Sequence, residues 1–205
     1  MASITDITSD LSPRNWKNFL ADIMPSQGCW TDEQYLVFTD HTNRLIEFTD
    51  GRLEPLPMPT DRHQAILGFL YELFLAFIRP RGGKVRFSGL RLKIRDGKFR
   101  EPDLLLLLSA DDPRRESRFW HGADLALEVV SADKPHRDLV DKRGDYAEGN
   151  VPEYWIVNPE DETISVLRLD AGNYVEAGVY RRGEIAPSPL LAGFTVDVSS
   201  VFDAD

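Results

Sequence analysis

Residues 100–108 read REPDLLLLL, and residues 124–131 read DLALEVVS. Each stretch contains a short, unbroken apolar run, which is typical of a strand buried on both faces of a sheet. Asp103 stands at the start of the first run, and Glu128 lies inside the second. Acids in these positions can converge at one edge of a sheet, where a divalent cation relieves their repulsion. The two stretches therefore predict adjacent buried strands that carry a metal-binding pair of carboxylates.

A helix is predicted over residues 136–148, which read HRDLVDKRGDYAE and include Lys142. Lys142 follows Asp138 by four positions, so one interpretation is an ion pair along the helix, worth about 0.3–0.5 kcal/mol. The other interpretation places its ammonium group beside the two acids, where it stabilises developing negative charge. A cation held by carboxylates, with a lysine nearby, suits the hydrolysis of a phosphodiester.

The remaining elements complete a mixed α/β layer with helices packed on a sheet. We expect a strand at 35–38, a hairpin at 44–56 with its turn at 50–51, a helix at 62–78, a strand at 84–95 with a bulge near 88–89, a buried strand at 154–157 and an exposed hairpin over 163–180. Residues 1–34 are expected to form a peripheral arm with a short helix at 15–23. A single domain should follow over 35–205, with its core at about 62–158.

The composition indicates a soluble protein of the cytoplasm. The chain has 205 residues and one cysteine, Cys29, which excludes an internal disulfide and a cysteine-based zinc site. The longest apolar stretch, 65–78, contains Glu72 and is too short to span a bilayer. The N-terminus lacks the basic and apolar segments of a signal peptide. We therefore expect a reducing, cytoplasmic setting and no membrane partner.

The charge of the chain is unevenly distributed. The net charge is −10, which argues mildly against a general nucleic-acid binder. Residues 79–100, however, contain nine basic residues and one acid, a local charge of +8 that leaves −18 for the rest. Strands with solvated basic faces are one interpretation. The other is a basic ribbon that meets a phosphate backbone. Its residues would be Lys84, Arg86, Arg91, Lys93 and Arg95.

Several motifs follow one another in an order that resembles a known family. They are LIEFTDGRL at 45–53, HQAI at 63–66, EPDL at 101–104, LEVVS at 127–131, DLVDKRGDYA at 138–147, VPEYWIVNP at 151–159 and LLAGFTVDV at 190–198. The chain resembles the PD-(D/E)XK superfamily of restriction-endonuclease-like proteins and, more closely, the bacterial Uma-two family of endonucleases. The resemblance covers roughly residues 40–202. Each motif alone is weak, but seven in the same order are specific.

The resemblance implies an α/β fold with a restriction-endonuclease-like core. A mixed central sheet would be flanked by helices, with an N-terminal hairpin and a C-terminal β extension. The superfamily motif expects a lysine two positions after the strand acid, but this chain reads Glu128-Val129-Val130. The resemblance implies that the lysine has moved to the following helix, at Lys142.

The same resemblance implies an endonuclease that hydrolyses DNA with Mg²⁺, for which Mn²⁺ can substitute. The implied catalytic residues are Asp103, Glu128, Lys142 and His63. The implied metal ligands are Asp103, Glu128, a third carboxylate at Glu47 and the backbone carbonyl of Val129, since hard cations accept carbonyl oxygens. A homodimer through an edge of the 163–180 hairpin is also expected.

Two alternatives remain open from the sequence. An inactive binding module with the nuclease fold would explain the valine at the strand lysine position and the acidic net charge. A metal-dependent phosphoesterase with a small substrate would use the same acids without any need for a basic surface.

Overall fold

The computed structural model describes residues 24–131 and 136–204. Its helices are α2 (Asp32–Thr39), α3 (Asp61–Ile78), the 3₁₀ turn η2 (Arg79–Arg81), the π-helical turn η3 (Arg137–Asp141), α4 (Lys142–Glu148) and α5 (Val198–Phe202). The predicted helices at 62–78 and 136–148 are confirmed by α3 and by η3 with α4. Within the described residues, none of the helices is both long and apolar enough to cross a bilayer.

Six strands form the larger sheet, in the order β11-β10-β9-β8-β6-β3. They are β3 (Lys84–Phe87), β6 (Leu104–Leu107), β8 (Leu125–Val129), β9 (Glu153–Asn158), β10 (Thr163–Asp170) and β11 (Asn173–Arg181). β8 and β9 pair in parallel and the other neighbours pair antiparallel, so the sheet is mixed. The three predicted central strands are confirmed by β6, β8 and β9, which are buried throughout. The predicted C-terminal hairpin continues this sheet. β11 forms its edge, and a homodimer through that edge stays a prediction.

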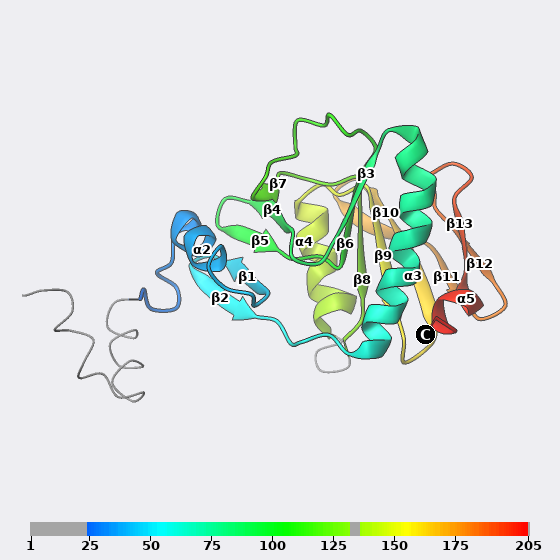
Figure 1. Cartoon of the computed structure of the whole chain (residues 1–205), viewed down its shortest axis with the longest axis horizontal. Coiled ribbons are helices and arrows are strands. Elements are labelled where there is room, and N and C mark those ends of the chain that lie inside the picture. Colours follow the sequence, from blue (N-terminus) through cyan, green and yellow to red (C-terminus); the bar gives the residue numbers. More distant parts are fainter. Residues whose placement is uncertain (1–23, 132–135, 205) are drawn as a thin grey trace, which may run out of the picture.

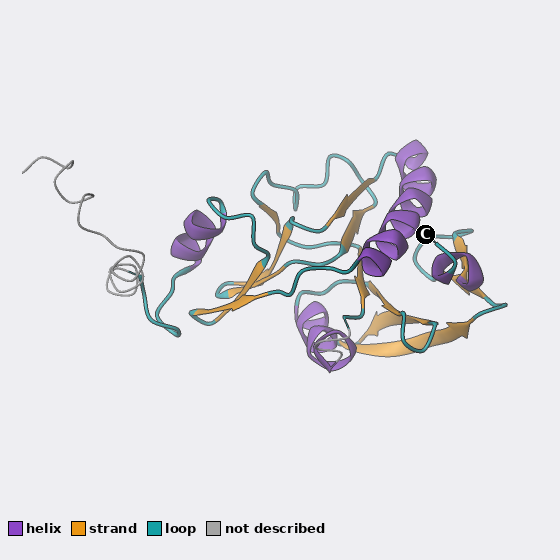
Figure 2. Cartoon of the chain, turned by 60° about the horizontal axis from the view of Figure 1, so that its bottom comes forward, coloured by secondary structure: helices purple, strands orange, loops and turns teal. Residues whose placement is uncertain are grey.

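Helices cover both faces of the larger sheet, with α3 on one side and α4 on the other (Figure 1, Figure 2). On the α3 face, the ring centroids of Phe74 and Trp155 lie 5.5 Å apart. On the α4 face, those of Tyr146 and Tyr154 lie 4.9 Å apart. A small sheet of β12 (Ile185–Pro187) and β13 (Thr195–Asp197) leads into α5 and extends the core on the α3 face. Burial on both faces explains why the central strands read as continuous apolar runs.

Five strands form a second, smaller sheet in the order β2-β1-β5-β4-β7. They are β1 (Ile46–Thr49), β2 (Arg52–Pro55), β4 (Arg91–Arg95), β5 (Lys98–Arg100) and β7 (Phe119–Trp120). The predicted hairpin is confirmed, and its turn residues Asp50 and Gly51 have the positive φ values, 46° and 79°, of a tight two-residue turn. The prediction of one bulged strand over 84–95 is wrong. After β3 the chain turns at Gly89, with a φ of 96°, and joins the other sheet as β4.

The segment before the hairpin is a helix, so the prediction of a strand at 35–38 is wrong. Thr31 and Gln34 form a reciprocal capping box that begins α2. Tyr35 is fully buried against Phe48, with their rings stacked 5.0 Å apart. α2 thus covers the smaller sheet instead of extending it. The predicted helix at 15–23 lies outside the described residues.

Candidate active site

Asp103 and Glu128 lie side by side because their strands are adjacent and antiparallel. β6 and β8 pair Leu104 with Leu127, so one further step in the same register sets Asp103 opposite Glu128. Residues opposite each other in such a pair point to the same face of the sheet. The Asp103 Oδ2 atom accepts a hydrogen bond of 2.8 Å from the Val129 N–H. The structure therefore brings the two predicted acids together.

Both acids line a pocket of about 720 Å³ between the start of α3, the ends of β8 and β9, and η3. The side chains of Asp103, Glu128 and Lys142 are only 14%, 3% and 5% exposed, so they lie deep in it. The segment after β2 supplies an apolar part of the wall, with Leu56, Pro57, Met58 and Pro59. A recessed, partly apolar cavity with a few convergent charged groups is the usual form of a ligand site.

His63 reaches Asp103 from the first turn of α3. Thr60 caps that helix by accepting a hydrogen bond from the His63 N–H. This cap fixes the backbone position from which the His63 side chain projects. The His63 Nε2 atom lies 3.1 Å from Asp103 Oδ2. Burial alone would lower the pKa of His63, but the hydrogen bond and charge of Asp103 outweigh it and raise this pKa. His63 therefore orients the Asp103 carboxylate.

Glu128 is held by two side chains of α4. Its Oε2 atom lies 2.8 Å from the Lys142 Nζ atom, and its Oε1 atom accepts a hydrogen bond from the Tyr146 hydroxyl. Burial raises the pKa of Glu128, while the ammonium group of Lys142 opposes that rise. A buried acid is stable only with such partners, since an unpaired one costs several kcal/mol.

Lys142 lies beside the strand acid Glu128, and its role as a substitute for the missing strand lysine stays a prediction. Its Nζ atom contacts Glu128 and Asp138, at 2.8 Å and 3.0 Å. The helical ion pair and the position beside the strand acid, which the sequence offered as alternatives, are thus both present. Burial would lower the pKa of Lys142, but the surrounding carboxylates raise it, so the side chain stays cationic.

The donors in the pocket fit a Mg²⁺ ion held by two carboxylates. Mg²⁺ prefers hard oxygen ligands and keeps several water molecules, so Asp103 and Glu128 are sufficient as its protein ligands. Within the part of the chain that the structure describes, no group of three or more histidine, cysteine and acidic side chains is arranged to hold a metal ion. Other ligands would therefore have to be water, substrate oxygens or a backbone carbonyl. Val129 lines the pocket, and its carbonyl stays a predicted ligand.

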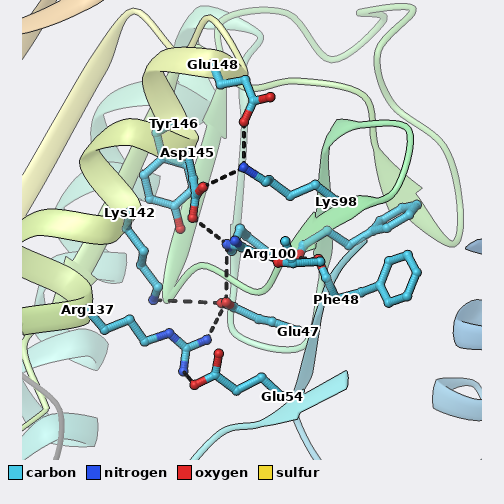
Figure 3. A network of polar contacts seen from close by, with 12 residues as sticks. Glu47, Phe48, Glu54, Lys98, Arg100, Arg137, Lys142, Asp145, Tyr146 and Glu148 are labelled. Carbon is cyan, nitrogen blue, oxygen red and sulfur yellow. Dashed lines mark hydrogen bonds and ion pairs between the residues drawn. The ribbon is translucent and has the colours of Figure 1, made fainter. Parts of the chain in front are cut away.

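Glu47 belongs to a network of ion pairs and not to the pair of acids in the pocket (Figure 3). It is 2% exposed and is not among the described residues that line the pocket. Its Oε2 atom contacts the guanidinium groups of Arg137 and Arg100, the latter at 3.4 Å. Its Oε1 atom lies 3.9 Å from the Lys142 Nζ atom. Both oxygens of Glu47 face cations, and a metal-binding role for Glu47 stays a prediction.

The five basic residues predicted to bind a nucleic-acid backbone do not form one ribbon. Lys84 and Arg86 lie on β3 of the larger sheet, whereas Arg91, Lys93 and Arg95 lie on β4 of the smaller one. The cations of β4 contact acids, namely Arg91 with Asp40 at 2.9 Å, Lys93 with Asp96 at 2.6 Å and Arg95 with Asp50 at 2.7 Å. None of the five is among the described residues that line the pocket. The predicted basic ribbon is thus divided between two sheets, and the binding of a nucleic-acid backbone by these residues stays a prediction.

Among the further charged residues that line the pocket are three of low exposure to which the sequence analysis gave no site role: Glu101, Arg137 and Asp138. Burial raises the pKa of Glu101 to about 7, and its Oε2 atom has no hydrogen-bond partner among the described residues. A signal exists for two of the three in the sequence. Glu101 stands next to Pro102-Asp103, and Asp138 lies one helical turn before Lys142. For Arg137, the only signal in the sequence is its position next to Asp138.

The mixed sheet, its two covering helices and the acid pair on adjacent strands define a restriction-endonuclease-like α/β protein. More narrowly, the chain belongs to the Uma-two family, because the sequence model of that family (Uma2, "Putative restriction endonuclease") matches residues 32–199. A crystal structure of "a putative nuclease belonging to DUF820" from Anabaena variabilis ATCC 29413 shares the fold, with a TM-score of 0.72 and 19% sequence identity. That match covers 84% of this chain and 97% of the other. None of the curated proteins matches the chain.

Proposed function

We propose that the protein is a Mg²⁺-dependent endonuclease that hydrolyses phosphodiester bonds in DNA. The observation that carries this proposal is the juxtaposition of Asp103 and Glu128 in one pocket, with Lys142 at 2.8 Å from Glu128. Membership of a family described as restriction endonucleases supports it. The position of Lys142 argues against an inactive scaffold, since the helix restores the cation that the strand lacks.

The residues of the pocket divide the work of such a reaction. Asp103 and Glu128 would hold the Mg²⁺ ion, which when bound activates a water molecule and polarises the phosphate. His63 and the Val129 N–H fix the Asp103 carboxylate through Oδ2. Lys142 is a permanent cation at the site, and it stabilises the negative charge that develops on the phosphate oxygens.

A phosphoesterase with a small substrate is the second candidate. The observation that favours it is the absence of the predicted basic residues from the described lining of the pocket, because a DNA duplex is normally held by many lysine and arginine contacts. A small phosphodiester needs only the pocket itself. Cleavage of bis(p-nitrophenyl) phosphate without cleavage of plasmid or single-stranded DNA would favour this candidate.

Asp103→Asn should reduce Mg²⁺-dependent cleavage at least about 100-fold, because it removes the charge of one of the two metal-binding acids. The assay compares plasmid nicking by wild type and variant with Mg²⁺, with Mn²⁺ and with EDTA. Asp170→Asn, at an exposed hairpin residue, is the matched control and should cleave like wild type. Isothermal titration with Mn²⁺ should show that Asp103→Asn also binds the metal ion more weakly than wild type. Equal nicking by Asp103→Asn and wild type would reject the mechanism.

A further inference from the structure

Arg137 lines the pocket, and neither the motif order nor the proposed metal chemistry gives it a role. It is the first residue of η3, and such π-helical turns are frequent at functional sites. Its side chain is 12% exposed, so the guanidinium group is largely withdrawn from water. A largely buried guanidinium group at the wall of a pocket calls for an explanation.

Glu47 and Glu54 fix the guanidinium group of Arg137 from one side. The Nη2 atom pairs with Glu47 Oε2, and the Nη1 atom lies 3.5 Å from Glu54 Oε1. Glu47 also lies 3.9 Å from the Nζ atom of Lys142, so the same acid faces two cations of the pocket, Arg137 and Lys142. Figure 3 shows Arg137 and Lys142 projecting from neighbouring turns toward Glu47.

The charge of the pocket shows why these two cations matter. Its described lining includes acids that would repel a phosphate, among them Asp103, Glu128 and Asp138. The lysine and arginine residues of that lining are Arg62, Arg137 and Lys142. Arg62 is 55% exposed and pairs with Glu162 at the surface, so it does not reach the buried acids as Lys142 does.

We propose that Arg137 binds a non-bridging oxygen of the substrate phosphate and that Glu47 positions it. The planar guanidinium group presents five N–H donors, and its two ion pairs leave others for phosphate oxygens. This inference rests on the proposed function, because it takes the pocket to be the site of a phosphodiester. It assigns to Glu47 the orientation of two cations in place of the metal-binding role that the sequence suggested.

Inorganic phosphate is the probe for this inference, titrated calorimetrically into the protein with and without Mg²⁺. Arg137→Met should weaken phosphate binding at least about ten-fold. The phosphate affinity of Arg137→Lys should lie between those of wild type and Arg137→Met, because lysine keeps the charge but loses the planar, bidentate guanidinium group. Folding should survive, since Glu47 keeps its contacts with Arg100 and Lys142. The matched control is Arg118→Met, because Arg118 also pairs with two acids, Glu33 and Asp40, and is not among the described residues that line the pocket. Its phosphate affinity should equal that of wild type.

The outcomes separate this inference from the proposed function. Wild-type affinity in Arg137→Met, or no phosphate binding by wild type in either condition, would overturn the inference. Nuclease activity could still be present in both cases. Conversely, a protein that cleaves no phosphodiester but loses phosphate binding in Arg137→Met would retain the inference and reject the function. In an active enzyme, Arg137→Met should raise KM for bis(p-nitrophenyl) phosphate and lower kcat. A purely structural role of Arg137 would not produce these changes together with a loss of phosphate affinity.

Glu47→Gln tests the positioning role by a different measurement. If Glu47 orients Arg137, this variant should weaken phosphate binding about three-fold or more and leave the Mn²⁺ affinity unchanged. If Glu47 were instead a metal ligand, Mn²⁺ affinity would fall and the inference about Glu47 would be wrong. Far-ultraviolet circular dichroism and urea unfolding show whether the variant is folded. If it is not, Glu54→Gln replaces it, because Glu54 pairs with Arg137 from an exposed position.

Discussion

Lys142→Met should lower the free energy of unfolding by about 3–5 kcal/mol, because it leaves buried carboxylates without their cation. The Lys142 Nζ atom lies 2.8 Å from Glu128 and 3.0 Å from Asp138. Neither acid is open to solvent, since Glu128 is 2% and Asp138 is 6% exposed. Methionine has a similar length but no charge, so packing changes little. Urea-induced unfolding at neutral pH measures the difference from wild type.

Two further variants distinguish the effect of unpaired buried carboxylates from the effect of changed packing. Arg143→Met removes a cation from the next position of α4 and should alter stability by about 0.5 kcal/mol or less. Lys142→Met combined with Glu128→Gln removes one of the stranded charges and should regain at least about 1 kcal/mol over Lys142→Met alone. A double variant that is no more stable than Lys142→Met would show that the ion pair is not the cause.

The central strands can be predicted from the sequence because burial on both faces removes the polar alternation of an exposed strand. Leu104 to Leu107 and Leu125 to Val129 therefore stand out by composition alone. The switch between sheets at Gly89 cannot be predicted in this way. β3 and β4 have similar basic and apolar alternation, and only their partners, β6 for one and β5 for the other, separate them.

The error at 35–38 has a local cause. Four residues with apolar and aromatic side chains fit a short strand as well as one turn of a helix. The sequence did contain the deciding signal, since Thr31 and Gln34 have the spacing of a capping box. That signal precedes the apolar run and predicts a helix that begins at Asp32, as the structure shows.

The predictability of the site residues also depends on whether local or distant parts of the chain place them. Asp103 and Glu128 are predictable because each is placed by its own strand, and adjacent strands have a fixed register. The partner of Glu47 is not predictable, because Arg137 lies 90 residues away along the chain. A buried acid in a strand looks the same in sequence whether a metal ion or an arginine balances its charge.

Asp145 links α4 to β5 of the smaller sheet. Asp145→Asn should lower the free energy of unfolding by about 3 kcal/mol at neutral pH. Its carboxylate on α4 contacts Arg100 and Lys98 of β5, at 2.7 Å and 2.9 Å (Figure 3). All three side chains are 10–13% exposed, so asparagine leaves two poorly hydrated cations with one fewer carboxylate. Glu148→Gln is the matched control, because Glu148 contacts Lys98 from a position that is 40% exposed and should contribute about 1 kcal/mol or less.

The pH dependence of this difference tests its electrostatic origin. Burial alone would raise the pKa of Asp145, but Arg100 and Lys98 outweigh it and hold the pKa below its ordinary value. A carboxyl group with a lowered pKa stabilises the fold above its unfolded pKa of about 3.9, and this contribution disappears as the pH falls through the folded pKa. Wild type and Asp145→Asn should therefore differ most near neutral pH and converge below about pH 4. Urea titrations from neutral pH down to about pH 3 measure this difference in stability. If the difference stays constant over that range, packing and not charge is its cause.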